Sequence, residues 1–430
     1  MKENKKIVTA LDIGSSKILA VVAEVYKDGT FRVLAQGRTE SQGVLDGNIT
    51  SIEEAQPQVK SALVEAFGIA GKIPSNDVCT NISGKSVEGK DSSAEMPLRG
   101  RTVTLSDMKN VQSMAQDAVE LKEDQRLIKS ELLYYMLDNQ DEGYVGQNPI
   151  DAKSSRISAH MHSAVASAAN ALARVKVIRR SGMDISRILP EAWASGYAVL
   201  TEDEIQNGVV LIDIGAGTTD VAVFQAGLPR FTYTLNYGGR RITQRISGFV
   251  HCSMQEAESI KNKLDLRCSP EDEEVILYRA PLEEGGKKYS KLELSKMVYH
   301  EIRSLNLTIG KKLFEAGWYK SVNGAPCNTL TGGIVLTGGT SLLLGITELF
   351  SAMPGPLAYT FSTRLGRSRY TGDACIGLNS PKESAAMGLI AYEALRFKEG
   401  DEDEEETAAS DDSLWAKTKR FLIEFFIGQY

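Results

Sequence analysis

Short strand-like runs of apolar residues alternate with longer helical patterns along most of the chain. Nearly continuous apolar runs occupy 17–25 and 220–224, and shorter ones occupy 31–34, 78–82 and 332–336. Apolar residues recur at helical spacing in longer segments, at 56–67, 165–181, 254–264, 291–314 and 384–395. Strands that alternate with helices of this length predict an α/β fold.

Length and composition indicate a globular chain with more than one domain. At 430 residues and 42% hydrophobic, it can bury two or more cores of ordinary domain size. Its five cysteines lie far apart without metal-ligand spacing, which argues against a disulfide framework or a zinc site and favours a reducing cytoplasm. The sequence predicts no signal peptide, and no apolar run reaches the roughly 18 residues of a spanning helix.

Negative charge is concentrated near the C-terminus. Residues 398–412 contain nine acidic residues and one basic residue, a contribution of −8 to the net charge of −7. The rest of the chain is therefore close to neutral and has no basic field to hold nucleic acid, so we expect no nucleic-acid partner. Because the acidic run is poor in apolar residues, it predicts an unfolded linker at 398–412.

Two segments in different halves of the chain share a pattern of strand, glycine turn and second strand. They are 10–17 and 211–220, and the apolar runs around each turn predict two β-hairpins in two similar halves that face each other. In the first turn, Gly14 and small hydroxyl residues let the backbone approach phosphate oxygens, and Lys17 adds a charge. Alone, this motif also closes many ordinary hairpins. The second turn is more specific, because two glycines and two threonines lie between two aspartates.

A third element, at 334–342, places Gly338 and Gly339 directly after a buried-strand pattern. Glycine there leaves room for a flat ring or a sugar against the backbone, although alone the pair also fits any tight turn. In this order across both halves, the three elements predict two phosphate-binding hairpins and an adenosine pocket that close over one nucleotide.

These motifs resemble the pattern of the actin-like ATPase superfamily. The segments 189–198 and 383–391, rich in small residues, resemble its two connecting helices at the hinge. Within the superfamily, the chain resembles the FtsA family of bacterial cell-division proteins. The resembling features are Ser83-Gly-Lys after a strand, the segments 143–149 and 194–203, and a terminal amphipathic helix behind a linker.

Carried over residue by residue, the resemblance implies a site for ATP and Mg2+. Asp12 and Asp213 would hold Mg2+ through water. Glu258 and Lys261 match a helix that contacts adenine and ribose, but their i, i+3 spacing is also that of an ordinary surface pair. The residues implied to face the adenosine are Gly338 and Gly339, and those implied to face the phosphates are Gly14, Ser15, Ser16, Lys17, Gly215, Gly217, Thr218 and Thr219.

Glu191 stands where several relatives place a residue that orients the attacking water, a role that a carboxylate fills by accepting a proton. The alternative is a carboxylate at a helix start, where the helix dipole favours it. Because FtsA-like proteins are poor hydrolases as a group, the resemblance implies ATP binding with at most weak ATPase activity.

The fold implied by the resemblance is a two-lobed, actin-like (ribonuclease-H-like) α/β fold with four subdomains. A polar helix pattern at 106–121 and strands near 128–137 predict an inserted subdomain, which the resemblance makes SHS2-like. The expected parts are subdomain 1A at 1–83, 164–198 and 381–397, the insert 1C at 84–163, subdomain 2A at 199–236 and 326–380, subdomain 2B at 237–325, the acidic linker at 398–412 and an amphipathic helix at 413–430.

The final segment, 413–430, becomes apolar and aromatic again after the acidic linker. At about 100° per residue, its large apolar residues fall within one arc of about 140°. Such a helix is too short to span a bilayer but suits the headgroup plane of anionic lipid, whereas docking on the protein itself or on a partner is the alternative. The predicted membrane residues are Leu414, Trp415, Lys417, Lys419, Phe421, Leu422, Phe425 and Phe426.

The resemblance further implies a peripheral protein on the cytoplasmic face of the inner membrane at the division septum. It would form filaments, anchor FtsZ by binding the C-terminal peptide of FtsZ through 2B, and recruit other divisome proteins through 1C. The region 240–266, basic at Arg240, Arg241 and Arg245, would suit an acidic peptide. Two alternatives stay open: a small-molecule kinase of the actin superfamily, and a pilus-assembly adaptor of similar fold.

Overall fold

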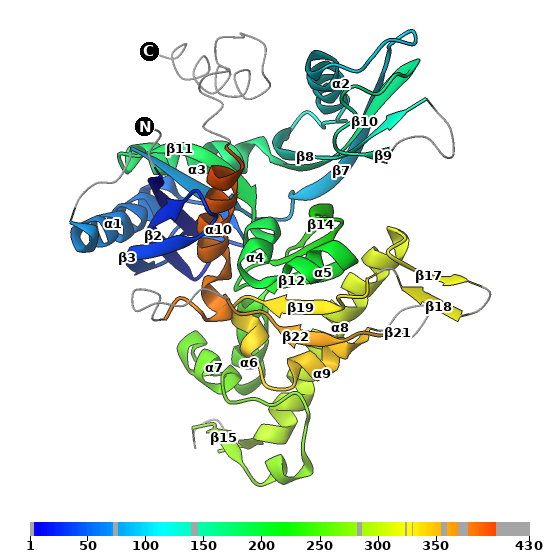
Figure 1. The fold of residues 1–430 in the computed structure, drawn as a ribbon. Helices are drawn as coiled ribbons and strands as arrows, with labels where there is room; N and C mark the ends of the chain where they lie inside the picture. Colours follow the sequence, from blue (N-terminus) through cyan, green and yellow to red (C-terminus); the bar gives the residue numbers. More distant parts are fainter. Residues whose placement is uncertain are drawn as a thin grey trace.

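The computed structural model describes residues 4–71, 76–138, 145–281, 286–322, 325–328, 330–353, 359–368 and 377–400. Figure 1 shows two lobes, each built on a sheet, with an insert above the second lobe and a helical part below it. The linker from 401 onward and the tail at 413–430 lie outside the described residues. The amphipathic membrane helix therefore stays a prediction.

The first lobe contains a five-stranded sheet in the order β11-β6-β1-β2-β3. Neighbouring strands among β1, β2 and β3 are antiparallel, whereas β6 and β11 run parallel to β1. One face of the sheet packs on α1 and α3, and the other packs on α4 and α10. The elements are β1 (Lys5–Ile13), β2 (Lys17–Tyr26), β3 (Phe31–Glu40), β4 (Val44–Leu45), β5 (Asn48–Ile49), α1 (Ile52–Ala70), β6 (Asp77–Ile82), α3 (Ala168–Arg180), β11 (Asp184–Pro190), α4 (Glu191–Val199) and α10 (Ser384–Glu399).

The helices α4 and α10 lie between the sheet of the first lobe and the sheet of the second lobe. Val209 and Leu211 of β12 pack in the core that contains α4 and α10, whereas Val210 and Ile212 pack on the opposite face with α6, α7 and α8. This alternation explains why the first four residues of the strand, Val209–Ile212, are all apolar. The elements are α5 (Glu202–Asn207), β12 (Val209–Ile214), β13 (Thr219–Gln225), β14 (Leu228–Leu235), α6 (Gly239–Val250), α7 (Met254–Lys261), β15 (Ile276–Arg279), β16 (Lys288–Ser290), α8 (Lys291–Glu315), β17 (Tyr319–Val322), β18 (Ala325–Asn328), β19 (Ile334–Thr337), α9 (Ile346–Ser351), β20 (Ala352–Met353), β21 (Tyr359–Thr360) and β22 (Thr363–Leu365).

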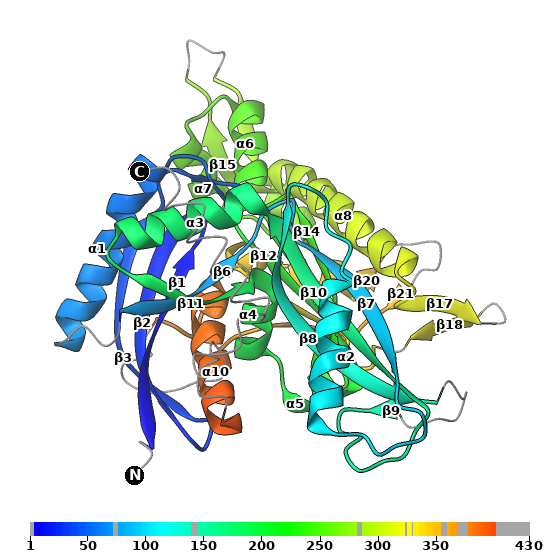
Figure 2. The ribbon, with the colours of Figure 1, turned by 90° about the horizontal axis from the view of Figure 1, so that it is seen from above.

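The insert adds its strands to the sheet of the second lobe, although its chain leaves from the first. The nine strands follow the order β22-β19-β12-β13-β14-β7-β10-β8-β9, and Tyr233 of β14 pairs with Glu88 of β7 at the junction. Figure 2 shows the long strands of the insert beside β14. Its elements are β7 (Glu88–Pro97), α2 (Leu105–Asp117), β8 (Gln125–Leu137), β9 (Val145–Gly146) and β10 (Arg156–Ser167).

The two predicted hairpins, the α/β class and most predicted elements are confirmed. The helix predicted at 165–181 begins at Ala168 instead, because residues 165–167 complete β10 in its pairing with β8. The helix predicted at 106–121 ends at Asp117, and α10 extends to Glu399, so the first two residues of the predicted linker are helical. Among the described helices, none is long and apolar enough to cross a membrane.

Candidate functional site

Two hairpin turns of matching geometry meet where the lobes approach each other. The N–H of Gly14 donates to the carbonyl of Lys17 at 3.0 Å, and the N–H of Gly215 donates to the carbonyl of Thr218 at 2.9 Å. Within the part of the chain that the structure describes, the remaining turn N–H groups have no acceptor; they belong to Ser15, Ser16, Ala216 and Gly217. A cluster of unpaired N–H groups in a turn is a concave site for an anion.

Both turns open onto one cavity of about 750 Å³ between the lobes. This volume lies in the usual range for sites that take small molecules. The cavity is lined by nearly all of the predicted site residues: Asp12, Gly14, Ser15, Ser16, Lys17, Glu191, Asp213, Gly215, Gly217, Thr218, Glu258, Lys261, Gly338 and Gly339. Residues separated by more than 300 positions in the sequence thus share one cavity.

Thr219 does not line this cavity. It is the first residue of β13, where the side chain is fully buried and its hydroxyl donates to the carbonyl of Tyr237 at 2.7 Å. Strand alternation explains the difference, because Thr218 faces the cavity and the next side chain must point to the opposite face. The prediction that Thr219 faces a phosphate is therefore wrong.

Carboxylates lie beneath the two turns: Asp12 and Asp213 are buried, and Glu191 is half-buried. Asn81 donates to Asp12 at 2.7 Å and to Glu191 at 2.5 Å, and Ser195 donates to Asp213 at 2.5 Å. Burial, opposed by the Ser195 hydrogen bond but reinforced by neighbouring carboxylates, raises the pKa of Asp213 to about 7. Burial and the nearby Asp12 and Asp213 raise the pKa of Glu191 well above its ordinary value. The cluster therefore favours a cation or protons among its carboxylates.

The residues around this cluster do not themselves form a complete metal cage. No group of three or more histidine, cysteine, aspartate or glutamate side chains could hold a metal ion within the described ranges. Asp12 and Asp213 nevertheless fit a hard cation that keeps much of its water, as Mg2+ does. Lys17 has its ammonium 3.4 Å from the carboxylate of Glu383, which is itself bound by Arg38 at 2.7 Å.

The Gly-Gly turn borders the same cavity, next to the second hairpin. Gly338 has a φ of +84°, and a Cβ there would lie 2.3 Å from a carboxylate oxygen of Asp213. Glycine is thus required at position 338 because the turn packs directly on the second hairpin. It does not leave open space for a ligand at that position. At Gly339 the nearest atom to an added Cβ belongs to Lys382, at 3.5 Å, so this residue borders more open space.

Glu258 and Lys261 form a pair that is not an ordinary surface pair. Lys261 is buried, and its ammonium donates to Glu258 at 2.7 Å and to the Thr243 hydroxyl at 3.0 Å. Burial lowers the pKa of Lys261, against the opposing effect of Glu258. Because both residues line the cavity, they can offer a charge and a carboxylate to a polar ligand there.

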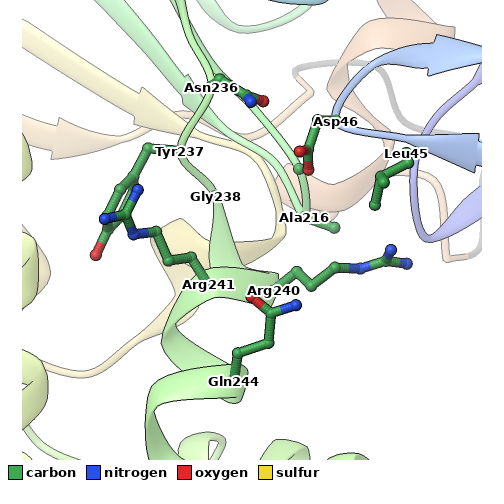
Figure 3. A pocket seen from close by; sticks show the side chains of 10 residues that line it. Leu45, Asp46, Ala216, Asn236, Tyr237, Gly238, Arg240, Arg241 and Gln244 are labelled. Atoms are coloured by element: carbon green, nitrogen blue, oxygen red, sulfur yellow. The ribbon is translucent and has the colours of Figure 1, made fainter.

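A smaller cavity of about 310 Å³ lies beside the second turn, and Ala216, Gly217 and Arg240 line both cavities. Figure 3 shows Arg240 and Arg241 extending from α6 in different directions. Arg240 donates to the carbonyl of Ser15 at 3.3 Å, and Arg241 lies over the Tyr237 ring, 5.2 Å from its centroid. The arginines predicted to suit an acidic peptide therefore have different surroundings, and Arg240 links the second lobe to the first hairpin.

Several residues that complete the site were not predicted as site residues from the sequence, although Ser83 was part of a motif that carried the family resemblance. Asn81 is the second-last residue of β6, and Ser83 directly follows that strand. Because β6 runs parallel to β1, the carboxyl ends of both strands meet at one edge of the sheet. Ser83 donates to Asp220 at 2.8 Å across the lobes. Arg174 is buried on α3 and donates to the carbonyls of Ile13 and Gly47. The parallel strand ends were a usable signal for Asn81, because ligand sites gather at that edge.

The two lobes, with similar hairpins facing one cavity, define an actin-like protein. A solved PilM-PilN type IV pilus biogenesis complex shares the fold at a TM-score of 0.57 and 14% identity, covering 91% of this chain and 98% of that one. MreB5 of Spiroplasma citri bound to ADP shares it at a TM-score of 0.51 and 16% identity, covering 92% and 99%.

Sequence comparison identifies the family. The model described as cell division protein FtsA matches residues 210–407, the SHS2 domain inserted in FtsA matches 84–165, and a type IV pilus assembly protein PilM model matches 137–278. The cell division protein FtsA of Pseudomonas aeruginosa is 31% identical over 402 residues, which is 93% of this chain and 92% of that protein. FtsA of Escherichia coli K12 is 26% identical over 96% of both chains. The chain belongs to the FtsA family of cell-division proteins, which decides against the kinase and pilus-adaptor alternatives.

Proposed function

We propose that this protein binds ATP together with Mg2+ in the larger cavity. The observation that carries the proposal is the pair of matched turns, whose unpaired N–H groups border the same cavity as two buried aspartates. Backbone N–H groups stabilise phosphate oxygens, and carboxylates balance a divalent cation. The ADP in the MreB5 structure of similar fold supports a nucleotide as the ligand.

Each lobe supplies part of the binding site in this assignment. The phosphates would lie against residues that line the cavity from both lobes: Gly14, Ser15, Ser16 and Lys17 of the first and Gly215, Gly217 and Thr218 of the second. Asp12 and Asp213 would hold Mg2+ through water, and that ion would supply positive charge to neutralise the phosphates. The lining residues that would surround the adenosine are Gly338, Gly339, Glu258 and Lys261.

Binding is favoured over rapid turnover by the state of Glu191. Burial and the neighbouring carboxylates raise its pKa, which favours the protonated carboxyl and so disfavours Glu191 as the acceptor of a proton from water. The half-buried side chain is also held by Asn81. We therefore assign Glu191 to orienting water, with at most weak ATPase activity.

In the cell, the proposed role is to anchor FtsZ filaments at the division septum. The family assignment supports this role, and the predicted tail at 413–430 would hold the protein on the cytoplasmic face of the inner membrane. Subdomain 2B at 237–325 would receive the C-terminal peptide of FtsZ, and the insert at 84–163 would contact other subunits and divisome proteins. Closure of both lobes over ATP would fix one subunit shape and so favour filaments.

Reconstitution on anionic liposomes tests this role. Labelled FtsZ should collect on liposomes when the full chain and MgATP are present. FtsZ should remain in solution when it is alone or when it is mixed with liposomes without this protein. FtsZ that lacks its C-terminal peptide is the matched control and should not be recruited. Equal recruitment of both FtsZ forms would contradict the proposed contact, and recruitment of neither would contradict the anchoring role.

A further inference from the structure

Arg174 is a fully buried arginine on α3. Its side chain is 1% exposed, and no carboxylate lies within ion-pair distance of it among the described residues. One terminal nitrogen donates to the carbonyl of Ile13 and the other to that of Gly47, both at 3.4 Å. Its Nε has no acceptor within the same described residues. Two long bonds to neutral carbonyls are little compensation for a buried charge.

The compensation comes from carboxylates slightly farther away. Burial lowers the pKa of Arg174 to about 10, while the charges of Glu191 and Asp12 oppose this shift. At neutral pH the guanidinium therefore keeps its positive charge. The attraction is mutual, because Arg174 is the group that lowers the pKa of Glu191 against the raising effects of burial and other acids. The buried arginine and the acidic cluster thus stabilise each other.

The guanidinium lies directly behind the wall of the larger cavity. Ile13 and Gly47 both line the cavity, and Arg174 binds both of their carbonyls without lining the cavity itself. Ile13 precedes the first turn, and the N–H of Gly47 donates to the hydroxyl of Ser15 in that turn at 3.0 Å. Asn170, one helical turn earlier on α3, donates to the carbonyl of Ser83 at 2.8 Å. Consecutive turns of α3 therefore fix the wall near the first hairpin.

We propose that Arg174 is a positioning residue for the nucleotide phosphates: its charge balances the buried carboxylates, and its two carbonyl contacts hold the first turn in place. The phosphates of ATP bring further negative charge to a cluster that contains Asp12, Asp213 and Glu191. Lys17 of the first turn and Mg2+ would offset part of that repulsion at the cavity surface, and Arg174 adds a positive charge behind the wall. This inference rests on the proposed nucleotide site and adds a charge that the ligand never touches.

The test compares ATP affinity with Mg2+ and with a chelator, in wild type and variants. Arg174→Met keeps much of the volume but removes the charge, so affinity without Mg2+ should fall at least about tenfold, as expected for a unit charge in partly screened surroundings. Affinity with Mg2+ should fall less, because the ion supplies positive charge. Arg174→Lys keeps the charge and should keep the wild-type ratio of the two affinities.

Two controls separate charge from general structural damage. Arg180→Met makes the same change on the same helix, at a side chain 59% exposed and 3.5 Å from Glu53, and it should leave both affinities unchanged. The double change Arg174→Met with Glu191→Gln removes the guanidinium together with one of the carboxyl groups that its charge favours in the ionised form. It should recover thermal stability relative to Arg174→Met alone, whether or not nucleotide is present.

The outcomes distinguish this inference from the proposed function. The charge role would be overturned if a folded Arg174→Met variant kept the wild-type ratio of ATP affinity with Mg2+ to ATP affinity without it. It would also be overturned if Arg174→Lys changed that ratio as much as Arg174→Met does. Failure of the double variant to recover stability would overturn the charge balance, and this readout needs no ATP. Wild-type protein that binds no ATP while the double variant recovers stability would instead contradict the proposed nucleotide site alone.

Discussion

Replacing Thr232 by valine should weaken the junction where the insert joins the second lobe. Thr232 is buried, and its hydroxyl receives the indole N–H of Trp193 at 2.8 Å and lies 3.0 Å from Nε2 of His162. Nδ1 of His162 lies 2.6 Å from a carboxylate oxygen of Asp91, which only accepts. Nδ1 therefore carries a proton, and Nε2 shares a hydrogen bond with the Thr232 hydroxyl. One hydrogen-bonded chain thus connects α4, β14 and the insert strands β10 and β7.

The size of the effect follows from the groups left without partners. Valine has nearly the shape of threonine, so the change removes only the hydroxyl and leaves the indole N–H and the imidazole nitrogen buried and unpaired. Each costs about 1 to 3 kcal/mol, giving a loss of about 2 to 6 kcal/mol. In a chain of this size, that loss should lower the melting temperature by several degrees, at roughly 2 °C per kcal/mol.

Scanning calorimetry of the variant and a neighbouring control measures this loss. Ser163→Ala also removes a buried hydroxyl from β10, but its partner Ser130, at 2.7 Å, is only half-buried and can turn to water. Its effect should stay below about 1 kcal/mol. If Thr232→Val lowers the melting temperature no more than Ser163→Ala does, the hydrogen-bonded chain does not stabilise the junction.

Three further predictions concern the nucleotide, the filament and the membrane. Gly338→Ala should abolish ATP binding in a fluorescent-nucleotide assay, because the added Cβ meets Asp213, whereas Gly339→Ala should weaken it far less; equal effects would contradict this packing. MgATP should promote head-to-tail filaments on lipid monolayers in electron microscopy, and only monomers at high concentration would count against it. Removing 413–430 should release the protein from anionic liposomes in co-sedimentation without loss of ATP binding. The apolar residues should dominate there, so Phe425→Glu should weaken binding more than Lys417→Ala, and complete release by salt alone would contradict the amphipathic anchor.

The hairpins and the Gly-Gly turn were predictable because each is a local pattern. In each hairpin a short turn joins two apolar strands that follow one another directly in the sequence, and the Gly-Gly pair directly follows an apolar strand, so the sequence alone indicates the geometry. Thr219 was wrongly predicted to face the phosphates because resemblance to a motif does not show which side chains of a strand point to which face. The register Ile214 with Thr219 turns that side chain away from Thr218 and into the core.

Long-range contacts account for what the sequence did not indicate. Arg174 occupies an apolar face of α3, and its partners Ile13 and Gly47 are more than 100 positions away. The insert was recognised as a separate segment, but its sheet joins the second lobe through the pairing of Tyr233 with Glu88, and no local pattern specifies that partner. Lys261 likewise had the spacing of a surface pair, and only tertiary packing buries it.

Calorimetric titration of ATP in the presence of Mg2+ tests the central claim most directly, that the cavity between the lobes is a nucleotide site. Wild-type protein should bind one ATP with micromolar-class affinity. Asp213→Asn keeps the side-chain shape and an oxygen for Ser195, but it removes the charge that would balance Mg2+, so measurable binding should be lost. Unchanged ATP affinity in that variant, or no binding by the wild type, would contradict the account.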